Sequence, residues 1–277
     1  MKKIFSVLIV CALICGIIIL SGCQGKNGRS EDGRSESAKL IVAMELAYPP
    51  FETKDNTGNP IGVSVDLAKA IGEYVGCEVE IVDTAWDGLI PSLKTGRVDL
   101  IISSMTITEQ RKEEVSFSDP YANAYLAILA NQHSDIASVE DLNQPGKKVA
   151  VKIGSTGFLY AQNHLNNAEI IALSDESACV VEVSQGKADG FLYDQLTIYR
   201  NHLNHPDTTT AVFIPFQDVE HWGAAVNKEN AVLLRQINEF ITIFRSEGGF
   251  DMLTDKYLGE EKKAFDQFGF QWFFDLK

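Results

Sequence analysis

The sequence predicts an α/β fold with two lobes, each a mostly parallel sheet flanked by helices. Short apolar runs alternate with segments of helical spacing, and this strand-helix-strand order is typical of parallel sheets covered on both faces. The same alternation begins again at Ser138. With 277 residues, of which 45% are hydrophobic and 22% charged, the chain is long enough for two lobes of about 100 to 130 residues each.

The first 22 residues have the pattern of a cleaved secretion signal. Two lysines precede an apolar run at residues 4–20, and the small residues directly before Cys23 resemble the lipobox of bacterial lipoproteins. We therefore expect residues 1–22 to be removed and Cys23 to carry acyl chains such as palmitate. The alternative is an uncleaved membrane anchor, because the apolar run is nearly long enough to span a bilayer. Both interpretations place the rest of the chain outside the cytoplasm, and two or more acyl chains would anchor it to the cell membrane.

Residues 23–38 predict a flexible tether, because they are rich in Gly, Ser, Asn and charged residues and offer little apolar surface for a core. Removal of residues 1–22 takes away Lys2 and Lys3 and no acid, so the formal charge changes from -14 to -16. An acidic chain of this kind argues against a nucleic-acid partner.

Two cysteines, Cys77 and Cys179, follow Cys23 in the expected mature chain. We expect no disulfide between them, because they fall in different predicted lobes. No cysteine or histidine spacing is typical of a metal site, and the sequence indicates no metal, cofactor or catalytic group.

The first lobe begins with a predicted strand at residues 39–44 and a stiff loop. Two prolines in this loop exclude a helix or a central strand, so the loop presents Tyr48 and Phe51 at fixed positions. We expect Phe51 to fill the core. Tyr48 and Trp86, each on a loop at the same edge of the sheet, form a candidate aromatic clamp for a ligand, with burial in the core as the alternative.

Further elements of this lobe are expected at residues 64–71 (helix), 78–82 (strand) and 88–94 (helix).

The segment from Val98 to Tyr121 contains a candidate anion site. A buried strand at residues 98–102 is followed by a cluster of hydroxyl groups and then by Arg111 at the start of a helix. A guanidinium with hydroxyls and free backbone N–H groups can hold a carboxylate or a phosphate. The hydroxyls belong to Ser103, Ser104, Thr106 and Thr108.

The second lobe offers two further candidates. Glycines flank Ser155 and Thr156 at a strand-to-helix transition, where these residues form a second hydroxyl site or only cap the helix. Asp194 ends an apolar strand, where a buried carboxylate needs a partner; a surface aspartate or a helix cap is the alternative. Strands are expected at residues 126–130, 148–151, 169–173, 187–194 and 212–216, and helices at residues 138–142, 174–185 and 230–247.

These candidates together complement a small zwitterion. Arg111 would bind a carboxylate, Asp194 an ammonium group, and the aromatic pair the remaining part of the ligand. Because the charges lie in different lobes, the ligand gains all its contacts only when the lobes close around it.

Five motifs occur in order along the chain: Tyr48-Pro-Pro-Phe51, Val65-Asp-Leu-Ala-Lys-Ala-Ile71, Trp86-Asp-Gly-Leu-Ile-Pro-Ser-Leu93, Thr106-Ile-Thr-Glu-Gln-Arg111 and Phe117-Ser-Asp-Pro-Tyr121. With these motifs the chain resembles the polar amino-acid branch of the extracellular solute-binding proteins of ABC importers, family 3, over roughly residues 39 to 260. The resemblance implies a type II periplasmic-binding-protein fold whose lobes are joined by crossovers near residues 124–128 and 220–226. The implied division is 39–125 and 222–260 for lobe 1, 126–221 for lobe 2 and 261–277 for a C-terminal extension.

The resemblance also implies individual roles. Arg111 would hold the α-carboxylate of an amino acid with Ser104, Thr106 and Thr156, and Asp194 would hold the α-ammonium group. Tyr48 and Trp86 would sandwich the side chain. Glu45 matches a position that carries an acid toward the ligand side chain in some relatives, which favours arginine, lysine or histidine, with glutamine, cystine or another polar amino acid as alternatives.

The expected function is therefore the substrate-binding component of an amino-acid ABC importer, a monomer that delivers its ligand to a membrane permease. One alternative is an enzyme on the same scaffold, such as a dehydratase, which would need an acid or base beyond the groups that neutralise the substrate. The other is a ligand-sensing partner of a membrane receptor, which would use the same pocket.

Overall fold

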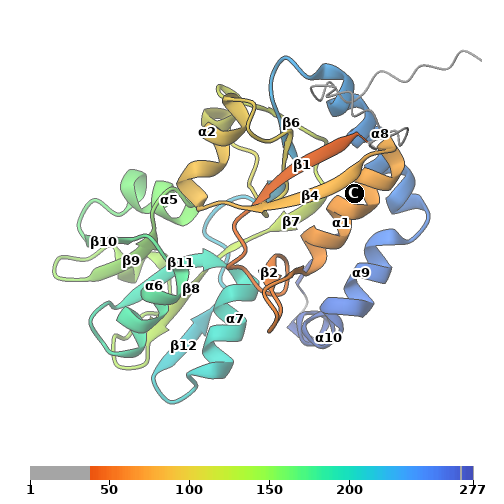
Figure 1. Cartoon of the computed structure of the whole chain (residues 1–277). Helices are drawn as coiled ribbons and strands as arrows, with labels where there is room; N and C mark the ends of the chain where they lie inside the picture. Colours follow the sequence, from red (N-terminus) through yellow and green to blue (C-terminus); the bar gives the residue numbers. More distant parts are fainter. Residues whose placement is uncertain (1–37, 269, 277) are drawn as a thin grey trace, which may run out of the picture.

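The computed structural model describes residues 38–268 and 270–276 and contains two lobes, each built on a five-stranded sheet (Figure 1). Helices cover both sheets, so the predicted two-lobed α/β fold is confirmed. The expected signal peptide, the acylation site at Cys23 and nearly all of the expected tether lie outside the described residues.

Sheet 1 belongs to lobe 1 and is more mixed than the sequence predicts. Two of its strand pairs, β1–β4 and β1–β5, are parallel, whereas β14 is antiparallel to both β5 and β6. The antiparallel pairs arise because β14 enters from the late part of the chain, after the second lobe is complete. In order across the sheet the strands are β4 (Glu78–Asp83), β1 (Lys39–Met44), β5 (Leu100–Ile101), β14 (Ala225–Val226) and β6 (Ser116–Phe117).

Both faces of sheet 1 are buried. Val42 of β1 shares a core cluster with Leu67 of α1 (Val63–Val75). Its neighbour Ala43 belongs to the cluster under α2 (Leu89–Lys94) on the opposite face, because successive side chains of a strand point to opposite faces. A strand covered on both faces reads as a continuous apolar run, which is why the sequence predicts β1 with its correct bounds.

Sheet 2 belongs to lobe 2 and has two parallel and two antiparallel pairs. The strand expected at residues 212–216 instead occupies residues 209–212. Val212, opposite Ile128, is its last residue to pair with the neighbouring strand. In order across the sheet the strands are β10 (Glu169–Leu173), β9 (Lys148–Lys152), β11 (Gly190–Asp194), β8 (Leu126–Asn131) and β12 (Thr209–Val212), and the helices of this lobe are α4 (Val139–Leu142), α5 (Thr156–His164), α6 (Glu176–Ser184) and α7 (Gln195–Asn204).

Two connections between the lobes lie side by side. Strands β7 (Ala122–Ala124) and β13 (Glu220–Trp222) pair in antiparallel fashion, with Glu220 opposite Ala124. A pair of short crossing strands is suited to bending as a hinge. Residues on β13 therefore lie next to both lobes.

The aromatic residues of the segment expected as a C-terminal extension, residues 261–277, complete the core of lobe 1. Phe265, Trp272 and Phe273 are at most 3% exposed. The Phe273 carbonyl accepts a hydrogen bond of 2.6 Å from the Asn123 backbone N–H of β7, which ties the tail to the hinge. The remaining elements are β2 (Thr53–Lys54), β3 (Pro60–Ile61), the 3-10 turn η1 (Trp86–Gly88), α3 (Glu109–Lys112), α8 (Ala231–Ser246), α9 (Gly249–Tyr257) and α10 (Gly259–Phe268).

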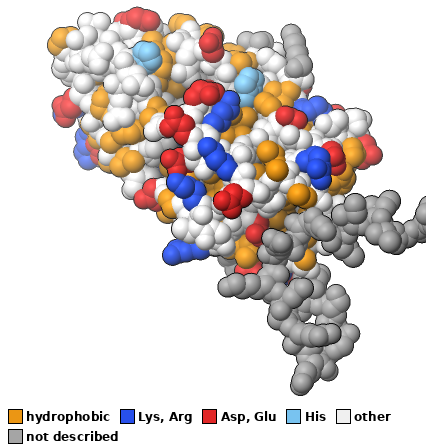
Figure 2. Space-filling view, turned by 90° about the horizontal axis from the view of Figure 1, so that it is seen from above, with side chains coloured by type: hydrophobic (Ala, Val, Ile, Leu, Met, Phe, Trp, Pro, Cys, Tyr) orange, Lys and Arg blue, Asp and Glu red, His pale blue; other side chains and the backbone are white. Residues whose placement is uncertain are grey.

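The surface carries charges of both signs. Acidic and basic side chains are interspersed on the face shown in Figure 2. Within residues 38–268 and 270–276, none of the helices combines the length and the apolar character that a membrane crossing requires.

Candidate ligand-binding site

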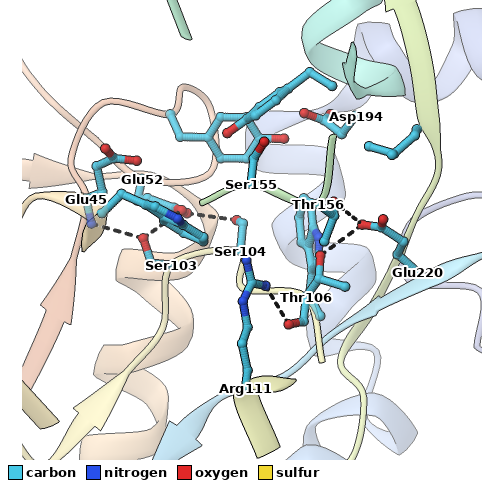
Figure 3. A pocket seen from close by; sticks show the side chains of 15 residues that line it. Glu45, Glu52, Ser103, Ser104, Thr106, Arg111, Ser155, Thr156, Asp194 and Glu220 are labelled. Carbon is cyan, nitrogen blue, oxygen red and sulfur yellow. Dashed lines mark hydrogen bonds between the residues drawn. The ribbon is translucent and has the colours of Figure 1, made fainter. Parts of the chain in front are cut away.

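A cavity lies between the lobes, where strands of both sheets end (Figure 3). β1 and β9 lead to it with their carboxyl ends, as expected for a ligand site in an α/β sheet. The structure brings all ten predicted binding residues to this cavity: Glu45, Tyr48, Trp86, Ser103, Ser104, Thr106, Arg111, Ser155, Thr156 and Asp194.

Arg111 is held rigidly on one side of the cavity. The Thr108 hydroxyl caps α3 by accepting the Arg111 backbone N–H at 3.2 Å. The guanidinium donates to the carbonyls of Thr106 (2.6 Å) and Gly154 (3.0 Å), and its centre lies 5.2 Å from the Trp86 ring. Arg111 is 8% exposed, and burial lowers its pKa to about 10. Among the described residues it forms no ion pair within 4.0 Å, so its charge is available to an anionic ligand.

Gly154 allows this contact between the lobes. Its φ is +75°, and a Cβ atom there would lie 3.0 Å from Nε1 of Trp86. A side chain at this position would push Trp86 away from the loop.

Ser103 and Ser104 are oriented by Glu52, a residue that the sequence analysis missed. Their hydroxyls donate to the Glu52 carboxyl at 3.3 and 3.1 Å, and the Ser64 hydroxyl donates to it at 2.6 Å. Ser104 has a φ of +47°, an unfavourable value for a serine that is typical of functional sites. Glu52 is 1% exposed, and burial raises its pKa to about 8. The Ser103 hydroxyl also accepts the Glu45 backbone N–H at 2.9 Å, which fixes the end of β1.

Thr106 and Thr156 share a second missed residue, Glu220 of β13. Both hydroxyls donate to its Oε2 atom, at 3.0 and 2.9 Å respectively. Its other oxygen, Oε1, accepts from the Gln217 amide at 2.7 Å. Burial raises the pKa of Glu220, whereas these hydrogen bonds and the Arg111 charge act in the opposite direction.

Ser155 is a helix cap. Its hydroxyl accepts the Phe158 backbone N–H at 3.1 Å at the start of α5. Capping fixes the N-terminus of α5, and free N–H groups at a helix N-terminus favour an anion.

Asp194 combines two roles that the sequence presented as alternatives. Its Oδ1 atom caps α7 by accepting the backbone N–H groups of Leu196 (2.9 Å) and Thr197 (3.1 Å). Its Oδ2 atom is buried and makes no hydrogen bond of good geometry with the described residues, although the nearby Tyr48 hydroxyl interacts with this carboxylate and acts to lower its pKa. Asp194 is 7% exposed, and burial raises its pKa. A buried carboxylate oxygen without a partner is costly, so Oδ2 is suited to receive a cationic group.

Glu45 forms an ion pair with Lys152, the last residue of β9, which was also missed. The pair joins the lobes, and Lys152 is 4% exposed. Its ammonium lies 5.5 Å from the centre of the Trp86 ring, so Lys152 and Arg111 both lie close to this indole.

The nearby Glu176 carboxyl has its pKa raised to about 8, first by burial and then by Asp194.

Tyr48 lines the cavity and also packs in the core. It is 8% exposed and stacks on Phe51 with 5.4 Å between ring centres. Its buried hydroxyl makes no hydrogen bond of good geometry in the described part of the chain and interacts with the Asp194 carboxylate. Its edge-to-face contacts with Tyr193 and Trp222 continue the aromatic wall.

Of the three further residues Glu52, Lys152 and Glu220, local patterns in the sequence could have identified only the first two. Lys152 directly follows the strand predicted at residues 148–151, a position close to that which marked Asp194 at the end of its strand. Glu52 directly follows the recognised Tyr48–Phe51 loop. Glu220 has no local signal, because it reaches the cavity only through the crossing of β13 back to lobe 1. The lining residues outside the predicted set are Glu52, Leu126, Tyr193, Glu220 and Trp222.

Two known proteins are similar to nearly the whole chain. A protein of Neisseria gonorrhoeae named "Probable histidine-binding protein" is 30% identical over 257 residues, which cover 91% of this chain and 96% of that protein. The arginine-binding extracellular protein ArtP of Bacillus subtilis (strain 168) is 31% identical over 268 residues, covering 95% of this chain and 100% of that protein.

One solved structure is also similar to this chain. The ancestral amino acid-binding protein AncCDT-1, a precursor of cyclohexadienyl dehydratase, is 36% identical with a TM-score of 0.72, covering 79% of this chain and 95% of that chain. Residues 40–260 match the model of the bacterial extracellular solute-binding proteins, family 3. The chain therefore belongs to the bacterial extracellular solute-binding proteins, family 3.

Proposed function

We propose that this protein is the substrate-binding component of an ABC importer and captures a free polar L-amino acid between its lobes. The proposal rests on two charged groups of opposite sign that line one cavity from different lobes and have no ion-pair partner among the described residues. The Arg111 guanidinium belongs to lobe 1, and the unpartnered Oδ2 atom of Asp194 belongs to lobe 2. An amino acid offers the complementary carboxylate and ammonium at a fixed separation.

The ligand carboxylate would bind to Arg111, with help from the nearby hydroxyls and the N-terminus of α5. The ammonium group would bind Oδ2 of Asp194, and the side chain would extend along Trp86 and Tyr48. Closure of the lobes would complete both contacts at once, because Arg111 also reaches Gly154 of the other lobe.

A cationic side chain, as in arginine, lysine or histidine, fits the charge of the lining best. Four carboxyl groups line the cavity, at Glu45, Glu52, Asp194 and Glu220, against the single guanidinium of Arg111. Burial raises the pKa of Glu52 to about 8, so the negative charge at neutral pH comes from the other three. Lys152 offsets one of them through its ion pair with Glu45. Relatives named for arginine and histidine binding support the same ligand class.

The proposed role is binding without catalysis, with delivery of the ligand to a membrane permease. The relatives described above are named as binding proteins, and the structural neighbour is itself an amino acid-binding protein, although a precursor of a dehydratase. Incubation with the bound amino acid followed by mass spectrometry should recover it unchanged. Appearance of a new product would favour the enzyme.

Outside the described residues, we propose that Cys23 carries the acyl chains that anchor a monomer to the extracytoplasmic face of the membrane. Cys23→Ser should release the protein into the soluble fraction, whereas Cys179→Ser, at a buried free cysteine, should leave the fractionation unchanged. Retention of the Cys23 variant in the membrane fraction would favour the uncleaved anchor. Light scattering of the released protein would measure whether it is monomeric.

Thermal-shift screening tests the binding proposal directly. The standard amino acids, ornithine, citrulline and cystine would each be added to the purified protein. A bound ligand stabilises the folded state, so we expect the largest shifts with cationic amino acids. The proposal would be abandoned if none of these compounds raised the melting temperature.

A further inference from the structure

Glu220 connects three parts of the molecule at one point. It lies on the hinge strand β13, and its Oε2 atom accepts hydrogen bonds from Thr106 of lobe 1 and Thr156 of lobe 2. Figure 3 shows both bonds converging on this carboxylate beside the cavity. The Gln217 amide donates to the other oxygen at 2.7 Å and fixes the orientation of the carboxylate.

These two hydroxyls are the same groups that the proposed function assigns to the ligand carboxylate. A threonine hydroxyl has one proton and can donate one hydrogen bond. Thr106 and Thr156 therefore cannot donate fully to Glu220 and to a ligand carboxylate at the same time. Two carboxylates at this position would also repel each other.

We propose that Glu220 is an internal competitor of the ligand carboxylate, which joins the two lobes through Thr106 and Thr156 and releases these hydroxyls when an amino acid binds. The inference rests on the proposed function. Its first consequence is that Glu220 favours closed lobes in the absence of ligand. Its second consequence is that Glu220 weakens ligand binding, because part of the population already has its hydroxyls occupied.

Two variants and one control test this inference. Glu220→Ala removes both carboxylate oxygens, and Glu220→Gln keeps the shape and removes the charge, which covers the case in which the alanine variant does not fold. Glu182→Ala is the control, because Glu182 pairs with Lys187 (3.7 Å) and does not line the cavity. Each protein would be freed of ligand by unfolding and refolding, and circular dichroism would confirm the fold.

Titration calorimetry with the amino acid found by thermal shift measures the competition. We expect both Glu220 variants to bind about 3- to 10-fold more tightly than the wild type, as removal of an occupied state predicts, and the control to bind as the wild type does. Weaker binding by the variants would overturn the inference and make Glu220 a direct ligand contact. Unchanged binding would overturn it as well.

Small-angle X-ray scattering of the ligand-free proteins measures the bridge independently of any ligand. We expect a larger radius of gyration for Glu220→Ala than for the wild type and the control, and equal radii would overturn the bridge. If no amino acid binds any of the proteins, the proposed function fails, whereas the scattering result still decides whether Glu220 holds the lobes together.

Discussion

The carboxylate of Glu45, which directly follows β1 and lines the cavity, forms an ion pair across the two lobes with the buried ammonium of Lys152 at the end of β9. The resemblance to other solute-binding proteins assigns Glu45 to the ligand side chain, but in the structure this carboxylate already has a cationic partner. A cationic side chain must therefore compete with Lys152 for Glu45.

Lys152→Met should increase the preference for arginine over glutamine. The substitution frees the Glu45 carboxylate for the ligand, and we expect the ratio of the two affinities to rise at least about fivefold, or roughly 1 kcal/mol. Titration calorimetry with both amino acids measures the ratio. Lys147→Met is the control, because Lys147 pairs with Asp189 (3.1 Å) and does not line the cavity. An unchanged or lower ratio would mean that the ligand side chain is recognised elsewhere.

Arg111→Ala should weaken amino-acid binding by about 2–5 kcal/mol, because the ligand carboxylate then lies buried without its cation. Titration calorimetry measures the loss. Arg235→Ala is a matched control, since Arg235 lies on α8, where its guanidinium is 3.9 Å from Glu239. Near wild-type affinity for the Arg111 variant would refute its assignment to the carboxylate.

Asp194→Asn should separate the capping role from the ligand role. The amide oxygen can still cap α7, so the melting temperature should change little, whereas loss of the charge should lower the affinity at least about 30-fold. Thermal unfolding and calorimetry measure the two effects. Asp175→Asn at the N-terminus of α6 is the control, because Asp175 makes no side-chain cap bond. If the Asp194 variant binds as well as this control, Asp194 is only a cap.

Glu52 should make the folded protein less stable as the pH rises. Its pKa is raised from 4.5 to about 8 in the folded state. Below pH 4.5 the carboxyl is protonated in both states, whereas between pH 4.5 and 8 only the unfolded chain releases the proton. The contribution of Glu52 to the free energy of unfolding is therefore fully present below this window. It falls across the window by up to about 1.4 kcal/mol per pH unit.

Glu52→Gln tests this dependence, because glutamine does not titrate. Between about pH 5 and about pH 8, the melting temperature of the wild type should fall more than that of the variant. Glu176 also has a raised pKa of about 8 and contributes equally to both proteins, so it does not affect the comparison. The exposed Glu80→Gln serves as the control. Parallel curves for the wild type and Glu52→Gln would show that Glu52 is ionised in the folded state.

Local patterns in the sequence were enough to predict the two-lobed α/β fold and to single out ten residues that the structure places around one cavity. The apolar run of β1 and the hydroxyls after β5 are local patterns, because burial on both faces and strand ends each leave a signal within a few residues. Asp194 was recognised for the same reason, since it directly ends an apolar strand. The sheets are more mixed than predicted, because β14 and β12 pair with strands from distant parts of the chain.

The contacts of those residues follow only from the three-dimensional fold. Glu52 lies 51 residues before Ser103, Lys152 lies 107 residues after Glu45, and Glu220 lies 114 residues after Thr106. Such pairs leave no periodicity in the sequence, because they meet only when the two sheets and the hinge bring distant strand ends together. The fold thus brings in Glu52 to orient the serine hydroxyls and Lys152 to neutralise Glu45. It also places Glu220 at the two threonine hydroxyls proposed to bind the ligand carboxylate.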